Sequence, residues 1–182
     1  MSGGHGHVDH GGNKGIALLI SVLALVLAFA ETLGKSAQTA ALASNIEASN
    51  LWAFFQAKTI RQTSLRTAAE QMEASNLGEN AKKQIAKWRD TVQRYQSEPE
   101  TGEGSEQLSE RAKHAEEERD LAEAKYHHFE LASAAFQIGI VLASATIITG
   151  MIALTWVSGV LALAGIAVTA LGVLSPHLLH LH

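Results

Sequence analysis

The chain has 182 residues, of which 47% are hydrophobic, and its formal net charge at pH 7 is −4. The mild negative charge argues against a nucleic-acid partner, which would require a basic patch. The absence of cysteine excludes disulfides, thiolate metal sites and cysteine nucleophiles. The hydrophobic residues are concentrated in residues 15–33 and 133–174, whereas residues 35–130 are polar and charged. Because a membrane-spanning helix needs about 20 consecutive apolar residues, this segregation indicates an integral membrane protein.

Residues 1–14 form a Gly- and His-rich tail without hydrophobic periodicity, which we expect to be disordered. Residues 15–34 have the length of a transmembrane helix. A signal peptide is the alternative, but the tail before this segment carries one basic residue, Lys14, and no clear small-residue cleavage site follows. We therefore expect a retained first span. Its helix should continue well beyond residue 34, because no Gly or Pro follows until Gly78.

Residues 35–130 are predicted to form a long extramembrane antiparallel helical hairpin, similar to a coiled coil. A weak break at residues 76–80, where Gly78 suits a helix C-terminus, and a clear loop at residues 97–105 divide this region. The expected helices are about 36–75, 79–97 and 105–131. At about 1.5 Å per residue, a turn near Gly78 lets two arms of about 60 Å close on each other.

The returning arm of this hairpin has the clearest periodicity in the chain. Positions at alternating spacings of four and three, interrupted only by Arg119, are Leu108, Ala112, Ala115, Ala122, Tyr126 and Phe129. The same register continues through Ser133, Phe136 and Ile140, so this arm and the second span should be one helix. On the outgoing arm, the small residues that would let the two helices approach closely are Ser36, Ala40, Ser44 and Ala48.

Residues 133–174 contain 42 positions without a charge, about twice the length of one span. We therefore expect two further transmembrane helices, residues 131–154 and 157–175, which gives three spans in an all-α fold. The turn is placed at residues 155–159, where Trp156 suits the membrane interface and Ser158–Gly159 suit a bend. Small residues, among them Gly139 and Gly165, should pack the spans together. The polar side chains inside the spans should bond one helix to another; they are Ser21, Gln137, Ser144, Thr146, Thr149 and Thr169.

Histidines are the candidate metal ligands, because imidazole binds Zn, Cu and Ni. With three spans, the C-terminal tail (residues 176–182) lies on the same membrane face as residues 127 and 128. The weak candidate ligands are therefore His127, His128, His177, His180 and His182. Adjacent helical residues point about 100° apart, however, and no carboxylate stands at ligand spacing. We expect no metal site, no cofactor and no catalytic residue, because the chain shows no phosphate-binding glycine loop and no constrained catalytic arrangement.

The most distinctive sequence string is ASNLWAFFQAKTIR at residues 48–61, which places three large aromatic residues outside the membrane. In a two-helix hairpin these aromatic residues cover more than one face, so at least one should be exposed unless another chain buries it. Packing against the returning arm and binding of a partner both remain open, since aromatic residues are enriched in interfaces. The candidate interaction residues are Trp52, Phe54, Phe55, Gln56 and Lys58.

Residues 48–58, together with the Phe136–Gln137 pair at the start of the second span, resemble the domain of unknown function DUF4337. This family comprises uncharacterised bacterial membrane proteins. Its motif carries an acid where this chain has Asn50, and tyrosines where it has Phe54 and Phe55. The resemblance covers most of the chain and implies the architecture described above, but it implies no activity.

These observations favour a non-catalytic structural or interaction protein, multi-pass in the bacterial inner membrane. We expect it to contact the lipid bilayer and to assemble through the hairpin, as a homo-oligomer or with a membrane-protein partner. The alternative is an accessory subunit of a transport or metal-handling system, with the His-rich tails collecting metal. Lys35 and Lys125 near the spans, against Lys14 alone on the other side, slightly favour a cytoplasmic hairpin.

Overall fold

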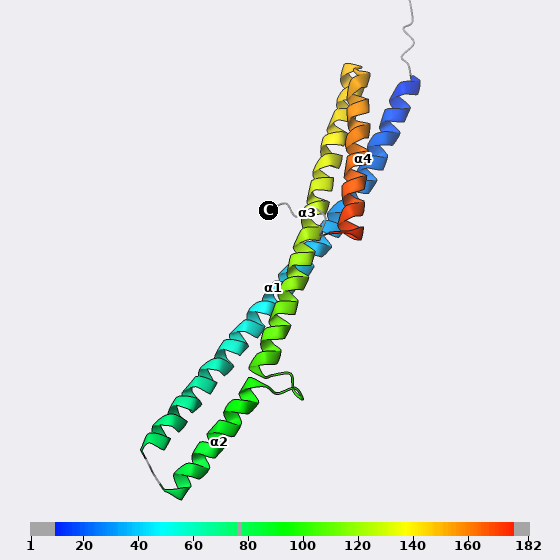
Figure 1. Cartoon of the computed structure of the whole chain (residues 1–182). Helices are drawn as coiled ribbons and strands as arrows, with labels where there is room; N and C mark the ends of the chain where they lie inside the picture. Colours follow the sequence, from blue (N-terminus) through cyan, green and yellow to red (C-terminus); the bar gives the residue numbers. More distant parts are fainter. Residues whose placement is uncertain (1–9, 76–77, 177–182) are drawn as a thin grey trace, which may run out of the picture. The chain divides into compact units, whose positions relative to one another are not determined.

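Four α-helices make up the described part of the chain, residues 10–75 and 78–176, and no β-strand occurs within those residues. In the computed structural model the helices are α1 (His10–Ala74), α2 (Glu79–Gln96), α3 (Ser105–Thr149) and α4 (Ile152–Leu174) (Figure 1). The all-α fold expected from the sequence is confirmed. Helices α1, α3 and α4 contain 18-residue windows with mean hydropathies of 2.5, 2.0 and 2.3, and each is long and apolar enough to cross a membrane.

Helices α1 and α3 are uninterrupted over 65 and 45 residues. Each joins an apolar stretch to a polar stretch without a break, as the scarcity of Gly and Pro predicted. Helix α1 begins at His10, so the prediction of a disordered tail over residues 1–14 is wrong for residues 10–14. Each residue added to an existing helix gains a hydrogen bond, which favours this extension. Residues 1–9 lie outside the described residues.

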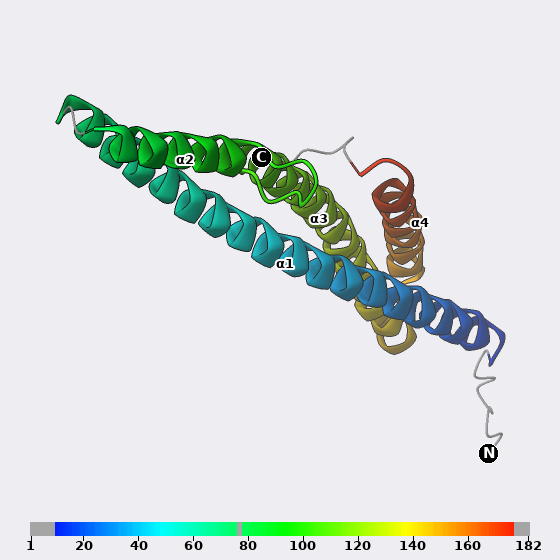
Figure 2. The ribbon, with the colours of Figure 1, turned by 90° about the horizontal axis from the view of Figure 1, so that it is seen from below.

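The chain divides into two compact units, residues 41–120 and residues 1–40 with 121–182. In the first unit, α2 lies alongside the C-terminal end of α1 (Figures 1 and 2). Arg89 of α2 and Glu73 of α1 form an ion pair there, with Nη2 and Oε2 2.6 Å apart. The core of the unit joins α1 to α3 and consists of Ala48, Leu51, Leu108, Ala112 and Ala115. Three of the predicted α3 positions are therefore confirmed as core.

The buried face of α1 in this unit contains the predicted Ser44 and Ala48 but does not continue at the predicted constant step of four. Residues at alternating spacings of three and four are buried or half-buried, and we call them the inner seam: Ala41, Ser44, Ala48, Leu51, Phe55, Lys58, Gln62, Leu65 and Ala69. Of the small residues predicted to face the returning arm, Ser44 and Ala48 belong to the inner seam, whereas Ser36 and Ala40, which lie in the other unit, are exposed. A constant step of four drifts by about 40° per turn around the helix, whereas alternating three and four follows a neighbouring helix.

The second unit contains the N-terminal part of α1, the C-terminal part of α3 and all of α4. Its core consists of Leu23, Ala30, Ala132 and Phe136. Glycine lets α4 approach α3 closely, because a Cβ at Gly165 would lie 2.6 Å from Cε1 of Phe136. The predicted close packing of these helices through Gly165 is thus confirmed. The outward side chains are large and apolar, such as Ile148 at 86% exposure and Leu163 at 71%, which suits contact with lipid.

The turn between α3 and α4 lies at Gly150 and Met151, so its placement at residues 155–159 is wrong. Gly150 has φ 72°, and its N–H donates to the Thr146 carbonyl at 2.8 Å. This left-handed helix end is one that glycine adopts at little cost. Ser158 lies inside α4 instead, fully buried, and its Oγ donates to the Gly139 carbonyl of α3 at 2.8 Å. Ser158, which suggested a bend in the sequence, therefore lies inside a helix and bonds the neighbouring helix.

Most hydroxyl groups in the apolar helices bond within their own helix. Of the residues predicted to bond between helices, those whose hydroxyl donates to the carbonyl four residues earlier are Ser21, Ser144, Thr146, Thr149 and Thr169. Between helices, Gln137 Nε2 donates to Glu31 Oε1 at 3.2 Å, and Thr155 Oγ1 donates to Thr146 Oγ1 at 3.1 Å. Bonding between helices was thus correctly expected for Gln137 and Thr146 only. The carbonyl one turn back is within reach of any helical Ser or Thr, which accounts for the others.

Candidate interaction site at residues 52–58

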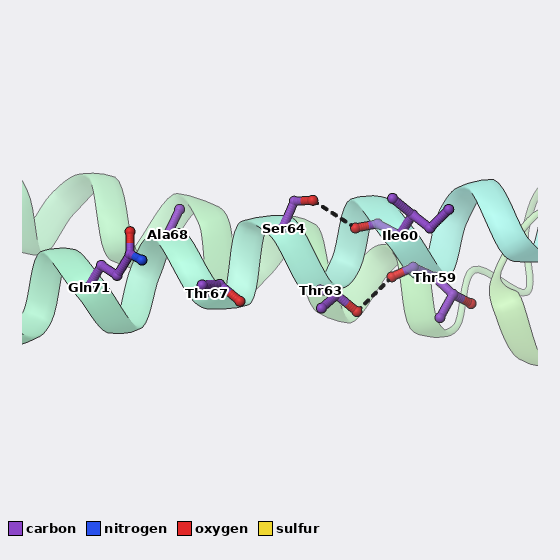
Figure 3. Close-up of a pocket in the computed structure, with 7 residues that line it drawn as sticks. All are labelled: Thr59, Ile60, Thr63, Ser64, Thr67, Ala68 and Gln71. Carbon is purple, nitrogen blue, oxygen red and sulfur yellow. Dashed lines mark hydrogen bonds between the residues drawn. The ribbon is translucent and has the colours of Figure 1, made fainter.

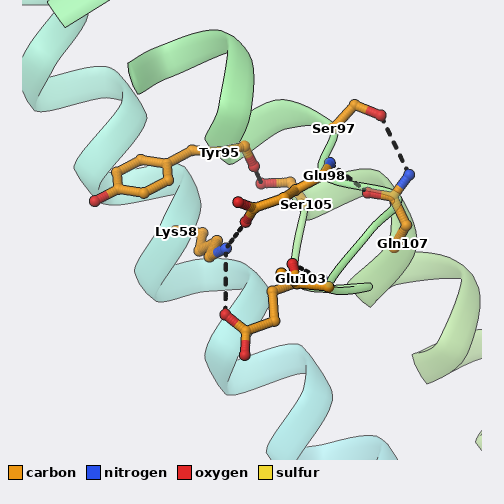
Figure 4. Close-up of polar contacts among 8 residues, drawn as sticks. Lys58, Tyr95, Ser97, Glu98, Glu103, Ser105 and Gln107 are labelled. Atoms are coloured by element: carbon orange, nitrogen blue, oxygen red, sulfur yellow. Dashed lines mark hydrogen bonds and ion pairs between the residues drawn. The ribbon is translucent and has the colours of Figure 1, made fainter. Parts of the chain in front are cut away.

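Lys58 belongs to the inner seam, and it is only 5% exposed although it carries a charge. Its Nζ lies 3.6 Å from Oε2 of Glu98 and 3.9 Å from Oε2 of Glu103, two residues of the loop between α2 and α3 (Figure 4). The same Nζ lies 5.4 Å from the ring centroids of both Phe54 and Tyr95. An ammonium group withdrawn from water needs such partners, and two carboxylates and two aromatic rings supply them.

The loop that bears the two glutamates is held by its own hydrogen bonds. The backbone N–H of Glu98 donates to Gln107 Oε1 at 3.1 Å, and Gln107 Nε2 donates to Ser97 Oγ at 3.2 Å. At the start of α3, Ser105 Oγ donates to the carbonyl of Tyr95 at 3.0 Å (Figure 4). These bonds tie the end of α2 to the start of α3. The loop therefore offers Lys58 a fixed pair of carboxylates.

Two glycines permit this loop conformation. Gly102 has φ 68°, a left-handed conformation that residues with a Cβ rarely adopt. A Cβ at Gly104 would lie 2.5 Å from the backbone nitrogen of Glu98 and 2.8 Å from Cα of Ser97. Both contacts are with backbone, so a side chain at Gly104 would have to displace the loop.

Trp52 and Phe55 join α1 to α3 within the chain. The indole Nε1–H of Trp52 donates to Glu116 Oε1 of α3 at 2.9 Å. Phe55 lies edge-on to the Trp52 ring, with centroids 5.4 Å apart and planes at 89°, a favourable aromatic geometry. Both rings pack against the core formed by Ala48, Leu51 and their α3 partners. For these two aromatic residues, the structure shows internal packing.

The remaining two candidate residues face outwards. Phe54 is 39% exposed although Lys58 covers part of its ring, and Gln56 is exposed. The expectation that at least one aromatic residue would be exposed is confirmed. Of the five candidate interaction residues, Phe54 and Gln56 are therefore those that another molecule can reach. That a partner binds them stays a prediction.

Sequence reasoning missed the residues that surround Lys58 and Trp52, namely Tyr95, Glu98, Glu103 and Glu116. They come from other elements, 37 or more positions along the chain from the residue that each contacts. No local spacing signals such contacts. The only hint was a lysine at a seam position of a regular helix, because a buried lysine requires partners.

A groove follows the exposed side of α1 beyond Lys58 (Figure 3). Its lining residues are Thr59, Ile60, Thr63, Ser64, Thr67, Ala68 and Gln71. Thr63 Oγ1 and Ser64 Oγ each donate at 2.9 Å to a carbonyl one turn earlier, so these hydroxyls are satisfied within α1. No charged residue lines the groove. It therefore suits an uncharged surface better than a charged ligand.

The candidate metal ligands do not come together in the described part of the chain. His128 is 4% exposed, with Nδ1 2.7 Å from the Ala124 carbonyl, and its Nε2 is buried without a hydrogen-bond partner among the described residues. His127 is exposed, with Nδ1 3.8 Å from Glu130 Oε2. Within residues 10–75 and 78–176, no group of three or more His, Asp or Glu residues could hold a metal ion. The other weak candidates, His177, His180 and His182, lie outside the described residues.

Glu130 also contacts Tyr126, one turn earlier on α3. Its negative charge is the main reason why the pKa of Tyr126 is raised, and the hydrogen bond from Tyr126 Oη to Glu130 Oε1 at 3.3 Å acts in the same direction. These contacts join residues three or four positions apart on one helix face, so they stabilise α3 locally.

The described residues therefore form an all-helical protein, and three of its helices are long and apolar enough to cross a membrane. The chain belongs to the family Domain of unknown function (DUF4337), whose model matches residues 12–175. The resemblance inferred from residues 48–58 and the Phe136–Gln137 pair is thereby confirmed. No curated protein and no solved structure matches the chain. The family has no assigned function, so any role rests on the chain's own residues.

Proposed function

We propose that this protein is a non-catalytic structural or interaction protein of the bacterial inner membrane. Three helices cross the bilayer, and residues 35–130 form an extramembrane antiparallel helical hairpin through which copies of the chain assemble. The mean hydropathies of α1, α3 and α4 support the spans. The 13 basic and 16 acidic residues between positions 35 and 130 support an aqueous location for the hairpin.

The main support for self-assembly is the apolar surface exposed on the polar part of α1. Leu42, Ile46 and Ile60 are 60%, 53% and 66% exposed. The inner seam and its partners already fill the interior of this unit, so the side chains of these three residues are not buried by the rest of the chain. Burying apolar surface contributes about 25 cal/mol per Å². Exposed apolar residues gathered on one helix therefore favour binding of another protein surface.

Native mass spectrometry of the full-length protein, extracted in mild detergent from its own membrane, tests the proposal. The expected result is a homo-oligomer with a fixed number of copies. A monomer without partners would contradict self-assembly. A single copy bound to a different protein would also contradict it, and would support an accessory subunit instead.

A further inference from the structure

A second set of regularly spaced residues lies on α1, on the side opposite the inner seam, and all its members are exposed. One half consists of Ile46, Ala53, Ile60 and Thr67, each seven residues from the next. The other half consists of Leu42, Ser49, Gln56 and Thr63, also seven apart. Taken together, the eight residues alternate at spacings of four and three, and we call them the outer seam. At about 100° per residue they fall within an arc about 100° wide.

The outer seam contains no charged residue. The exposed charges of α1 in this unit lie about 70–150° around the helix from the centre of the outer seam; they are Glu47, Arg61, Arg66, Glu70 and Glu73. The exposed faces of the other two helices of the unit do carry charges, unlike the outer seam. Helix α2 exposes Lys83 and Arg94, and helix α3 exposes Glu110 and Glu117. A water-facing helix surface is normally charged or polar, whereas charged residues are depleted in interface cores.

We propose that the outer seam binds the outer seam of a second copy, which forms a parallel pair of α1 helices. This inference rests on the self-assembly proposed above and adds the surface and its geometry. Alternating spacings of three and four let two helices wind around each other with these residues in contact. Ile46 and Ile60 occupy one core position of the repeat and Leu42 the other. Within parallel coiled coils, β-branched residues at the first position with leucine at the second favour two strands over three or four.

The chemistry of the face selects a second copy as the occupant. Two uncharged seams meet without like-charge repulsion, and the face has no charge with which to select an oppositely charged partner. Along one flank of the outer seam, Ala43, Asn50, Ala57 and Ser64 are small or uncharged and allow the helices to approach. The other flank carries Trp52 and Arg66, so the closest approach is expected on the first flank. Because α1 also contains a candidate span, copies in one membrane hold α1 in the same direction and at the same height.

The area of the outer seam determines the conditions under which the pair of copies should be detected. Residues 42–67 span about 38 Å of helix, and a strip about 10 Å wide corresponds to about 380 Å² per copy. A stable protein interface buries about 800 Å² per partner, so this strip alone would give a weak dimer. Confinement to one bilayer raises the effective concentration of the partner. The decisive experiment is therefore done in the native membrane.

Single cysteines can test the contact, because the full-length chain contains none of its own. Ile46→Cys and Ile60→Cys place a thiol within the outer seam. Glu47→Cys and Arg61→Cys are matched controls, exposed and one residue further along, but turned about 100° away. On oxidation in native membranes, the two seam variants should form disulfide-linked dimers and the controls should not. A disulfide requires Cβ atoms about 4 Å apart, so it reports direct contact.

The outcomes separate this inference from the proposed function. No cross-link at the seam, with a homo-oligomer still present in native mass spectrometry, would overturn the outer seam and leave self-assembly standing. Cross-links in Glu47→Cys or Arg61→Cys, without cross-links in the two seam variants, would likewise overturn the outer seam and leave self-assembly standing. A monomer in both experiments would overturn both proposals. Cross-links confined to the seam, together with a homo-oligomer, would support both.

A charge variant gives a second test that does not depend on thiols. Ile46→Lys combined with Ile60→Lys places like charges in the seam of both copies, and should abolish the oligomer seen by native mass spectrometry. Both residues are exposed in the single chain, so the circular dichroism of the helices should not change. An oligomer that survives this double substitution would refute the outer seam.

Discussion

Replacing Lys58 with methionine should loosen the loop between α2 and α3 while the helices stay intact. Methionine keeps an unbranched apolar side chain of similar length and removes the charge. The Lys58 side chain is 6% exposed, whereas those of Glu98 and Glu103 are 27% and 54% exposed. The two carboxylates can therefore regain water once the ammonium group is gone, which limits the cost of the substitution.

The expected magnitude follows from these contacts. The two contacts of Nζ with the rings of Phe54 and Tyr95 contribute about 0.5–1 kcal/mol each. The ion pairs, at 3.6 and 3.9 Å with partly exposed carboxylates, contribute about 0.5 kcal/mol each. Removing a buried charge recovers part of its desolvation cost, which offsets some of this sum. We expect a net loss of about 1–2 kcal/mol, a factor of about 5–30 in the local opening equilibrium.

Amide hydrogen exchange followed by mass spectrometry measures this opening in the full-length protein in detergent. Peptides covering residues 93–107 should exchange about 5–30 times faster in Lys58→Met than in the unmodified chain, since exchange follows local opening. Lys82→Met is the matched control, because Lys82 pairs with Glu79 at 2.9 Å while their side chains are 72% and 80% exposed. Such a surface pair contributes little. Equal exchange in the two variants would refute the idea that Lys58 holds the loop.

Gly165→Ala places a Cβ against the fully buried ring of Phe136, and such overpacking costs about 1–3 kcal/mol. At about 2–4 °C per kcal/mol for a chain of this size, the thermal midpoint followed by circular dichroism in detergent should fall by about 2–12 °C. Gly104→Ala should speed hydrogen exchange in residues 97–104, since its Cβ would lie 2.5 Å from the backbone nitrogen of Glu98. Gly159→Ala is the control for both variants, because nothing lies within 4 Å of its added Cβ. Alanine there should leave the thermal midpoint and the exchange rate unchanged, or make the protein slightly more stable. If either test variant matches this control, the close approach inferred at that glycine is wrong.

The α3 seam was predictable because it depends on spacing within one segment. Leu108, Ala112 and Ala115 recur at helical intervals and are at most 2% exposed. The exposed and buried sides of α1 were harder to separate. Small residues occur all around this helix, so Ala40 and Ala41 look equivalent in the sequence although only Ala41 is buried. The choice between them depends on which side of α1 a neighbouring helix covers, and the sequence of α1 does not contain that information.

The all-α fold, the continuity of α1 and α3 and the three apolar segments were predictable from the sequence alone, because helix continuity and hydropathy are local properties of the chain. The burial of Lys58 against Glu98 and Glu103 and the hydrogen bond from Ser158 to α3 arise only when the helices pack together. Each of these depends on residues brought together from separate elements. The free energy of such a contact is set by burial and by the distance between partners, and neither can be derived from the spacing of residues along one helix.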